Sequence, residues 1–230
     1  AETPVQLGAD GRAHFRARVP SLGRAVYHVV PGRADAARLQ VSARGMENDR
    51  LRVRLDTRGR VRSIYDKVQA REILAPRTTG NQLILFEDKP AAWDAWDIDI
   101  FYNDKALSVD GELLSVRVIE KGPVRGVIRI RRAISHSTVT QDLVLHADSS
   151  RLDFVTAVDW GDERDVLLKA AFPVNIRSQR ARYDIQFGSV ERPTHWNTPR
   201  DFAQFEVAAH KWADLSEGDS GVALLNDCKY

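Results

Sequence analysis

Alternation of apolar and charged residues with a period of two is the feature that most constrains how this chain folds. Residues 51–55 read Leu-Arg-Val-Arg-Leu, and residues 61–65 read Val-Arg-Ser-Ile-Tyr after the turn sequence Thr-Arg-Gly-Arg. Because successive side chains of a β-strand point to opposite faces, the first run places its apolar side chains on one face of a sheet. The two runs, with the turn between them, predict a β-hairpin.

Comparable runs recur along the chain, and turn signals such as Pro31-Gly32 and Asp110-Gly111 separate them. Strands are predicted at residues 13–18, 24–30, 38–43, 81–86, 113–120, 124–133, 136–146, 152–159, 165–173, 181–187, 203–209 and 220–226. No stretch longer than about ten residues has a helical period of 3.6, and the best candidate for a helix is the short segment 35–39. Even strands joined by hairpin turns predict an all-β fold, a large β-sandwich with curved sheets.

The chain divides into two parts of unequal size. Residues 1–42 read as two short strands and a linker, and we expect them to be the end of a preceding small β segment. Residues 43–230 are enough for one large sandwich domain. The apolar strand 222–225 is followed closely by the last residue, Tyr230. We therefore expect the sandwich to be truncated at its C-terminus and the chain to be a fragment of a longer protein.

Composition excludes several kinds of partner and site. No apolar run approaches the roughly 20 residues of a membrane span, so no membrane partner is predicted. Cys228 is the only cysteine, which excludes an intrachain disulfide and a cysteine-based zinc site and favours a reducing compartment, the cytoplasm. Arginines occupy most even positions from 50 to 62 with no aromatic stacking residue between them. They predict a solvated sheet face and no nucleic-acid partner.

The run 86–102 combines aromatic and acidic side chains. Indole rings stack on the C–H faces of sugars, and carboxylates accept hydrogen bonds from sugar hydroxyls. This composition predicts a carbohydrate-facing loop, and the candidate contact residues are Trp93, Asp94, Trp96 and Asp97. The alternative is a packing loop whose tryptophans close one end of the β core while the aspartates stay solvated.

A second polar segment, 187–198, carries charge, imidazole, indole and amide groups after a predicted strand. Binding residues gather on loops at the end of a sandwich, so Arg192 and His195 are candidates for ligand contact, and a packed crossover loop is the alternative. Metal ligands are not predicted, because no histidine pair has the spacing of H-E-x-x-H. The sequence His146-Ala147-Asp148 reads as a turn.

Several segments together resemble the β-domain of family 38 glycoside hydrolases, the retaining α-mannosidases. The first lies at 80–99, from Gly-Asn-Gln-Leu through Phe-Glu-Asp-Lys-Pro to Trp-Asp-Ala-Trp-Asp-Ile-Asp. Later segments are similar to that family's landmarks in the same order, at residues 171–174, 183–188, 191–194, 211–216 and 225–230. The resemblance covers nearly the whole chain and is closest to the bacterial and cytosolic branch.

The resemblance implies a galactose-mutarotase-like supersandwich that packs against an N-terminal α/β domain and a helical bundle. In the family, zinc (cobalt in some members), the aspartate nucleophile and the acid/base belong to that N-terminal part. This chain would then hold no catalytic residue, no metal and no cofactor, and would be inactive alone, with zinc or another divalent metal in the missing catalytic domain. The implied partners are an α-mannoside glycan and the N-terminal catalytic domain of the same polypeptide.

Within the intact enzyme, loops of this domain would border the sugar cleft. We expect Trp93, Asp94, Trp96 and Asp97 to face the cleft, with Arg192, His195 and Asn226 as weaker candidates. Their role would be stacking and positioning, through which remote binding energy assists the reaction. Two alternatives remain open, namely a stand-alone carbohydrate-binding sandwich module and a purely structural interdomain scaffold.

Overall fold

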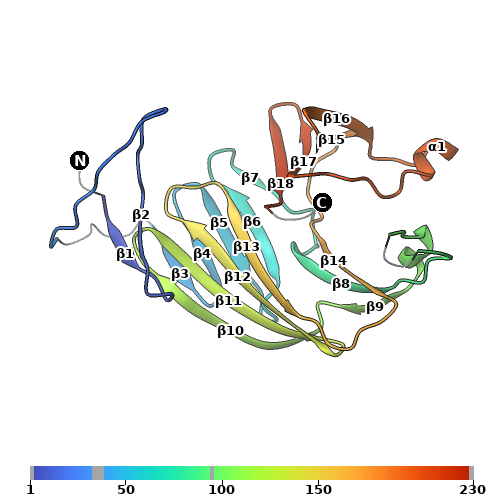
Figure 1. Cartoon of the computed structure of the whole chain (residues 1–230), viewed down its shortest axis with the longest axis horizontal. Helices are drawn as coiled ribbons and strands as arrows, with labels where there is room; N and C mark the ends of the chain where they lie inside the picture. The colour runs from blue at the N-terminus through green and yellow to red at the C-terminus, as the bar shows by residue number, and fades with distance from the viewer. Residues whose placement is uncertain (1–2, 33–38, 94–95, 228–230) are drawn as a thin grey trace.

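The computed structural model describes residues 3–32, 39–93 and 96–227, and strands dominate it (Figure 1). The predicted helix falls mostly on residues outside these ranges. Two antiparallel sheets form the main sandwich. One has four strands: β10 (Glu112–Lys121), β11 (Arg125–Ile134), β12 (Ser137–His146) and β13 (Leu152–Asp159). The other has five: β3 (Gln40–Ser42), β4 (Gly45–Glu47), β5 (Leu51–Leu55), β6 (Val61–Asp66) and β7 (Arg71–Glu72).

The main core lies between these two sheets. The alternation in β5 buries Leu51, Val53 and Leu55, each at most 6% exposed. They face β11 and β12 across the core, and Leu143 and Leu145 of β12 are fully buried. β5 and β6 pair antiparallel, so the predicted hairpin is confirmed, and the β-sandwich predicted from the alternation is the observed fold.

A smaller sheet extends the layer formed by the five-stranded sheet. Its order is β14-β8-β9, from β14 (Val166–Ala171), β8 (Gln82–Glu87) and β9 (Ala106–Val109). Leu83 and Leu85 of β8 pack on Ile134 and Val139 of the four-stranded sheet, which forms a second core cluster. The 3-10 helix η1 (Ile100–Asp104) lies between β8 and β9 and carries the chain past the end of this sheet.

The C-terminal sheet has the order β16-β15-β17-β18, from β15 (Arg180–Ile185), β16 (Gly188–Pro193), β17 (Trp212–Glu217) and β18 (Ser220–Leu225). It is joined to the five-stranded sheet by contacts at and just before β7, where Arg71 pairs with Glu217 of β17 and Gln69 accepts from the Ser220 hydroxyl of β18. The short helix α1 (Pro199–Phe202) follows β16. At the other end of the molecule, β1 (Val5–Leu7) and β2 (Ala13–Phe15) form a separate hairpin.

Two predicted strands are wrong. Residues 24–30 are exposed and have no strand partner, and the Tyr27 hydroxyl instead bonds to the backbone of Arg18. Residues 203–209 follow α1 and run as turns and extended chain. The prediction lacks six strands, β1, β4, β7, β9, β16 and β17. The first four have at most four residues, too few to show a period, and β16 and β17 have little apolar alternation.

Candidate functional site

The tryptophan-rich run lies where the three-stranded sheet ends. β8 leads into it and η1 follows it (Figure 1). The side chains of Trp93 and Trp96 are 75% and 90% exposed, so they do not close one end of the core. Asp97 is exposed as well. Asp94, the fourth predicted contact residue, lies outside the described residues.

Backbone hydrogen bonds define the shape of this loop. The carbonyl oxygen of Trp93 accepts from the amides of Trp96 at 2.6 Å and Asp97 at 2.9 Å. The Asp99 carboxylate accepts from the Ala91 amide at 2.9 Å and links the two sides of the loop. Trp93 has a φ of 60°, a conformation uncommon for a bulky residue. The indole rings are therefore presented to solvent by a hydrogen-bonded turn.

The base of the loop carries carboxylates in two different environments. Glu87 accepts from Lys89 at 2.9 Å and from Lys105 at 3.0 Å, and these bonds lower its pKa. Burial, followed by the nearby carboxylate of Asp99, raises the pKa of Asp88. Asp97 and Asp99 lie outside any strand, and the Asp97 amide donates to the carbonyl of Trp93 in the turn. Strand geometry therefore does not set the distance between the two carboxylates.

Three side chains that are not among the predicted contact residues connect η1 and β14 with the segment between α1 and β17. Tyr102 of η1 is 6% exposed, and its hydroxyl donates to the Glu206 carboxylate. Lys169 of β14 lies 2.6 Å from the same carboxylate and 4.4 Å from the centre of the Tyr102 ring. Burial, together with Glu206, raises the pKa of the Tyr102 hydroxyl. No local pattern could have revealed this cluster, because Tyr102 and Glu206 are 104 positions apart.

The second polar segment is partly a strand, so its prediction as a loop is wrong. Arg192 belongs to β16, the edge strand that pairs with β15, and His195 follows in a turn. Arg192 and Trp196 line a pocket of about 210 Å³. His195 is not part of its lining, but the His195 Nδ1 atom lies 3.7 Å from the carboxylate of the lining residue Asp201. The structure thus relates two of the predicted contact residues to one pocket, Arg192 as a lining residue and His195 through Asp201.

The local sequence explains how this turn is held. Thr198 caps α1: its hydroxyl accepts from the Asp201 amide, and the Asp201 carboxylate accepts from the Thr198 amide. Pro199 occupies the first helical turn, where no amide donor is needed. Thr-x-x-Asp with proline next to the threonine resembles a capping box, and this signal could have predicted α1.

Asn226 lies apart from Arg192 and His195. It follows β18, and its amide donates to the carbonyl of Lys211 at 2.7 Å. β16 and β18 are the two edges of the same sheet. The predicted contact residues therefore fall into three places: the tryptophan loop, the pocket beside β16, and the end of β18.

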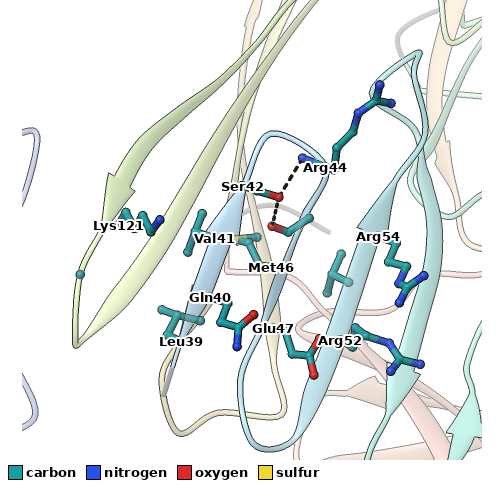
Figure 2. A pocket seen from close by; sticks show the side chains of 13 residues that line it. Leu39, Gln40, Val41, Ser42, Arg44, Met46, Glu47, Arg52, Arg54 and Lys121 are labelled. Carbon is teal, nitrogen blue, oxygen red and sulfur yellow. Dashed lines mark hydrogen bonds between the residues drawn. The ribbon is translucent and has the colours of Figure 1, made fainter. Parts of the chain in front are cut away.

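A larger open hollow of about 590 Å³ contains no predicted contact residue. It lies along β3, β4 and β5 beside the turn at Lys121, and Figure 2 shows Arg44, Arg52 and Arg54 among its side chains. The guanidinium of Arg52 lies 4.8 Å from the centre of the Tyr65 ring. The evenly spaced arginines thus belong to a partly solvated sheet face, with one of them stacked on an aromatic ring.

One group of side chains within the described ranges has the composition of a metal site, namely Asp10, His14 and Glu120. Both Glu120 oxygens already accept from the Arg125 guanidinium, at 2.7 and 2.8 Å. A cation would have to displace that guanidinium, so these residues do not fit zinc. His146 ends β12 and Asp148 lies in the following turn, as predicted, where Asp148 pairs with Arg16.

The fold and the exposed aromatic loop define a β-sandwich domain with a loop suited to contact a sugar or a neighbouring domain. A family model described as "Glycosyl hydrolases family 38 C-terminal domain" matches residues 46–230. The chain therefore belongs to this family.

Similar proteins support this assignment. The chain is 44% identical to "Alpha-mannosidase G" of Dictyostelium discoideum and 42% identical to "Alpha-mannosidase 2C1" of Homo sapiens, over 80% of its own length in each case. It spans less than a fifth of these relatives, 17% and 18% of their lengths. An α-mannosidase structure from Enterococcus faecalis V583 shares the fold, with a TM-score of 0.67, 14% identity, and coverage of 84% of this chain and 24% of the other. Within the described ranges, no helix has the length and apolar character needed to cross a membrane.

Proposed function

We propose that this chain is the non-catalytic β-domain of a retaining α-mannosidase of the bacterial and cytosolic branch, where it borders the sugar cleft during hydrolysis of terminal α-mannosides. The observation that carries the proposal is the exposure of Trp93 and Trp96 on a hydrogen-bonded loop in a family 38 domain. Indole faces at such a position can stack on a sugar ring and hold it for reaction elsewhere.

The chemistry of bond cleavage is assigned to the N-terminal catalytic domain of the same polypeptide. The resemblance to the family implies that zinc or another divalent metal would be held there. Among the described residues of this chain, the group Asp10, His14 and Glu120 already pairs with Arg125 through Glu120. The isolated chain is expected to be inactive, and the intact enzyme is expected to act in the cytoplasm on an α-mannoside glycan. Sequencing the reading frame upstream tests this directly, since it must encode an H-x-D motif and a nucleophilic aspartate.

A structural scaffold is the second candidate, and Phe101 favours it. This ring is 70% exposed and follows the two exposed tryptophans in sequence. Several large exposed apolar groups in one short stretch of chain are typical of an interface. In that case the loop would contact the catalytic domain, and the tryptophans would contribute to domain association rather than to sugar binding.

Substitution of Trp96 by alanine in the intact enzyme separates the two candidates. If the indole stacks on sugar, Trp96→Ala lowers kcat/KM for an α-mannoside by about tenfold, the size expected for loss of one stacked ring. The melting temperature should not change, because Trp96 is exposed. Trp160→Ala, at a 45% exposed position on the main sandwich, is the matched control. Unchanged kinetics with weaker domain association would instead support the scaffold.

A further inference from the structure

The pocket beside β16 is a built polar and aromatic site distinct from the tryptophan loop. Its lining includes Tyr183, Arg192, Trp196, Asp201, Gln204 and Phe205. Its lining residues come from β15, β16, α1 and the segments on either side of α1. The tryptophan loop instead follows β8, at the end of the three-stranded sheet (Figure 1). None of these pocket residues is needed to form the two core clusters.

The aromatic wall of the pocket is held in place and still accessible. Trp196 packs nearly perpendicular to Phe202, with ring centres 5.9 Å apart and planes at 84°. Such an edge-to-face contact fixes the indole orientation. Trp196 nevertheless keeps 53% of its surface exposed, which is available for stacking.

The pocket offers both donors and acceptors. The Arg192 Nε atom is buried and has no hydrogen-bond partner among the described residues, and a guanidinium only donates. Asp201 accepts from the Thr198 amide at 3.2 Å and lies 3.7 Å from His195 Nδ1. A carboxylate has further acceptor sites beyond these two contacts. A ligand that donates and accepts can therefore satisfy both groups.

These features discriminate between classes of ligand. An anion would pair with Arg192 but would be repelled by the Asp201 carboxylate. A metal ion would pair with Asp201 but would be repelled by the Arg192 guanidinium. An apolar side chain would leave both charged groups without new partners, which is unfavourable when they are desolvated. A neutral sugar ring presents hydroxyls that donate and accept, and C–H faces that stack on an indole.

The size of the pocket restricts the ligand further. About 210 Å³ is below the roughly 300 Å³ at which pockets for drug-sized ligands begin. It corresponds to about seven water molecules at roughly 30 Å³ each. The space is suited to one sugar ring and not to an extended oligosaccharide.

We propose that this pocket binds a single hexopyranose ring, with Trp196 as the stacking surface and with Arg192 and Asp201 bonding to its hydroxyls. The choice of an α-mannoside as the sugar rests on the proposed function. The fit to a neutral sugar ring rests only on the lining and the volume of the pocket. In the intact enzyme the pocket would hold a sugar residue of the glycan other than the one being cleaved.

The test uses the five indole N–H signals of the 15N-labelled chain, one for each tryptophan. Titration with methyl α-D-mannopyranoside should shift the Trp196 signal saturably and leave those of Trp160 and Trp212 unchanged. Arg192→Met should weaken this binding by about tenfold, as expected for loss of a charged hydrogen-bond donor. Arg117→Met, at an exposed position on β10, is the matched control and should bind like the parent chain.

Three results would overturn the proposal: no indole signal moves, only the Trp93 and Trp96 signals move, or sodium sulfate but not the mannoside moves the Trp196 signal. If Arg192→Met does not fold, as judged from its amide spectrum, Trp196→Phe replaces it. That variant keeps an aromatic ring against Phe202 and should bind more weakly. The kinetic effect of Trp96→Ala in the intact enzyme does not depend on this pocket, so the two proposals can fail separately.

Discussion

Buried polar residues join segments of this chain that are far apart in sequence, and Glu120 shows how. Its carboxylate accepts from Arg125, from the Gln6 side chain at 3.0 Å and from the Ala9 amide at 3.0 Å. These contacts attach the N-terminal hairpin of β1 and β2 to the main sandwich. The alternation pattern could not reveal them, because the partners of Glu120 are more than 100 positions away in the hairpin.

The Glu120 contacts predict a loss of stability in acid. The hydrogen bonds from Arg125 lower the pKa of Glu120. A lowered pKa in the folded state means that the stabilisation is fully present above the ordinary glutamate pKa of about 4.3 and is lost as the pH falls through the lower folded-state value. Urea unfolding of the parent chain across this range should show that decrease.

Glu120→Gln tests the assignment, because Asp10 and His14 also face this carboxylate. The variant should be less stable at neutral pH by about 2 kcal/mol, as expected for loss of a charged hydrogen-bond partner, and its stability should change less with acid. Glu112→Gln, at an exposed position, serves as the control. If the free energy of unfolding of Glu120→Gln falls as steeply in acid as that of the parent chain, groups other than Glu120 cause the loss of stability.

At the scale of single elements, the sequence predicts strands that a local alternation pattern and a turn define. It does not predict whether a segment finds a partner strand to pair with. The hairpin of β5 and β6 was predictable because alternation and the turn at Gly59, with a φ of 67°, agree. Residues 24–30 have a strand-like composition but no partner strand. β16 has little alternation and is an edge strand that ends at Pro193, a position where proline is tolerated because no further ladder bond is needed.

The capping of α1 gives a prediction at this scale. Thr198→Ala removes the hydroxyl that accepts from the Asp201 amide and should lower the free energy of unfolding by about 1 kcal/mol. The same change should broaden or shift the Trp196 indole signal, because Trp196 packs on Phe202 of α1. Thr57→Ala, at an exposed turn position, should change neither quantity. An unaltered stability of Thr198→Ala would mean that α1 does not depend on this cap.

For the whole molecule, the sandwich was predictable but the division of its strands among sheets was not. The candidate site shows the same limit. The composition of the run 86–102 was enough to single out Trp93 and Trp96 as candidate contact residues, and both are exposed. The separation of Arg192 from Asn226 follows from the order β16-β15-β17-β18. That order depends on which strands pair over long distances, which local patterns do not encode. The residues Tyr102, Lys169 and Glu206 were missed for the same reason.

The two-layer core predicts where the fold is most sensitive to substitution. Leu143 is fully buried between the sheets, so Leu143→Ala should lower the free energy of unfolding by about 2–5 kcal/mol. Leu224→Ala, at a position 54% exposed on β18, should cost less than about 0.5 kcal/mol. Chemical denaturation of both variants checks this contrast, and similar losses in the two would place the core elsewhere.

The backbone conformation of Trp93 has a consequence for protein engineering. A φ of 60° suits glycine or asparagine, and a bulky ring there costs of order 1–3 kcal/mol. A laboratory selection that rewards heat resistance alone should therefore replace this indole early. A selection that also rewards turnover of the intact enzyme should retain the indole. Comparing the residues found at position 93 after the two selections would measure the trade-off between stability and activity at this position.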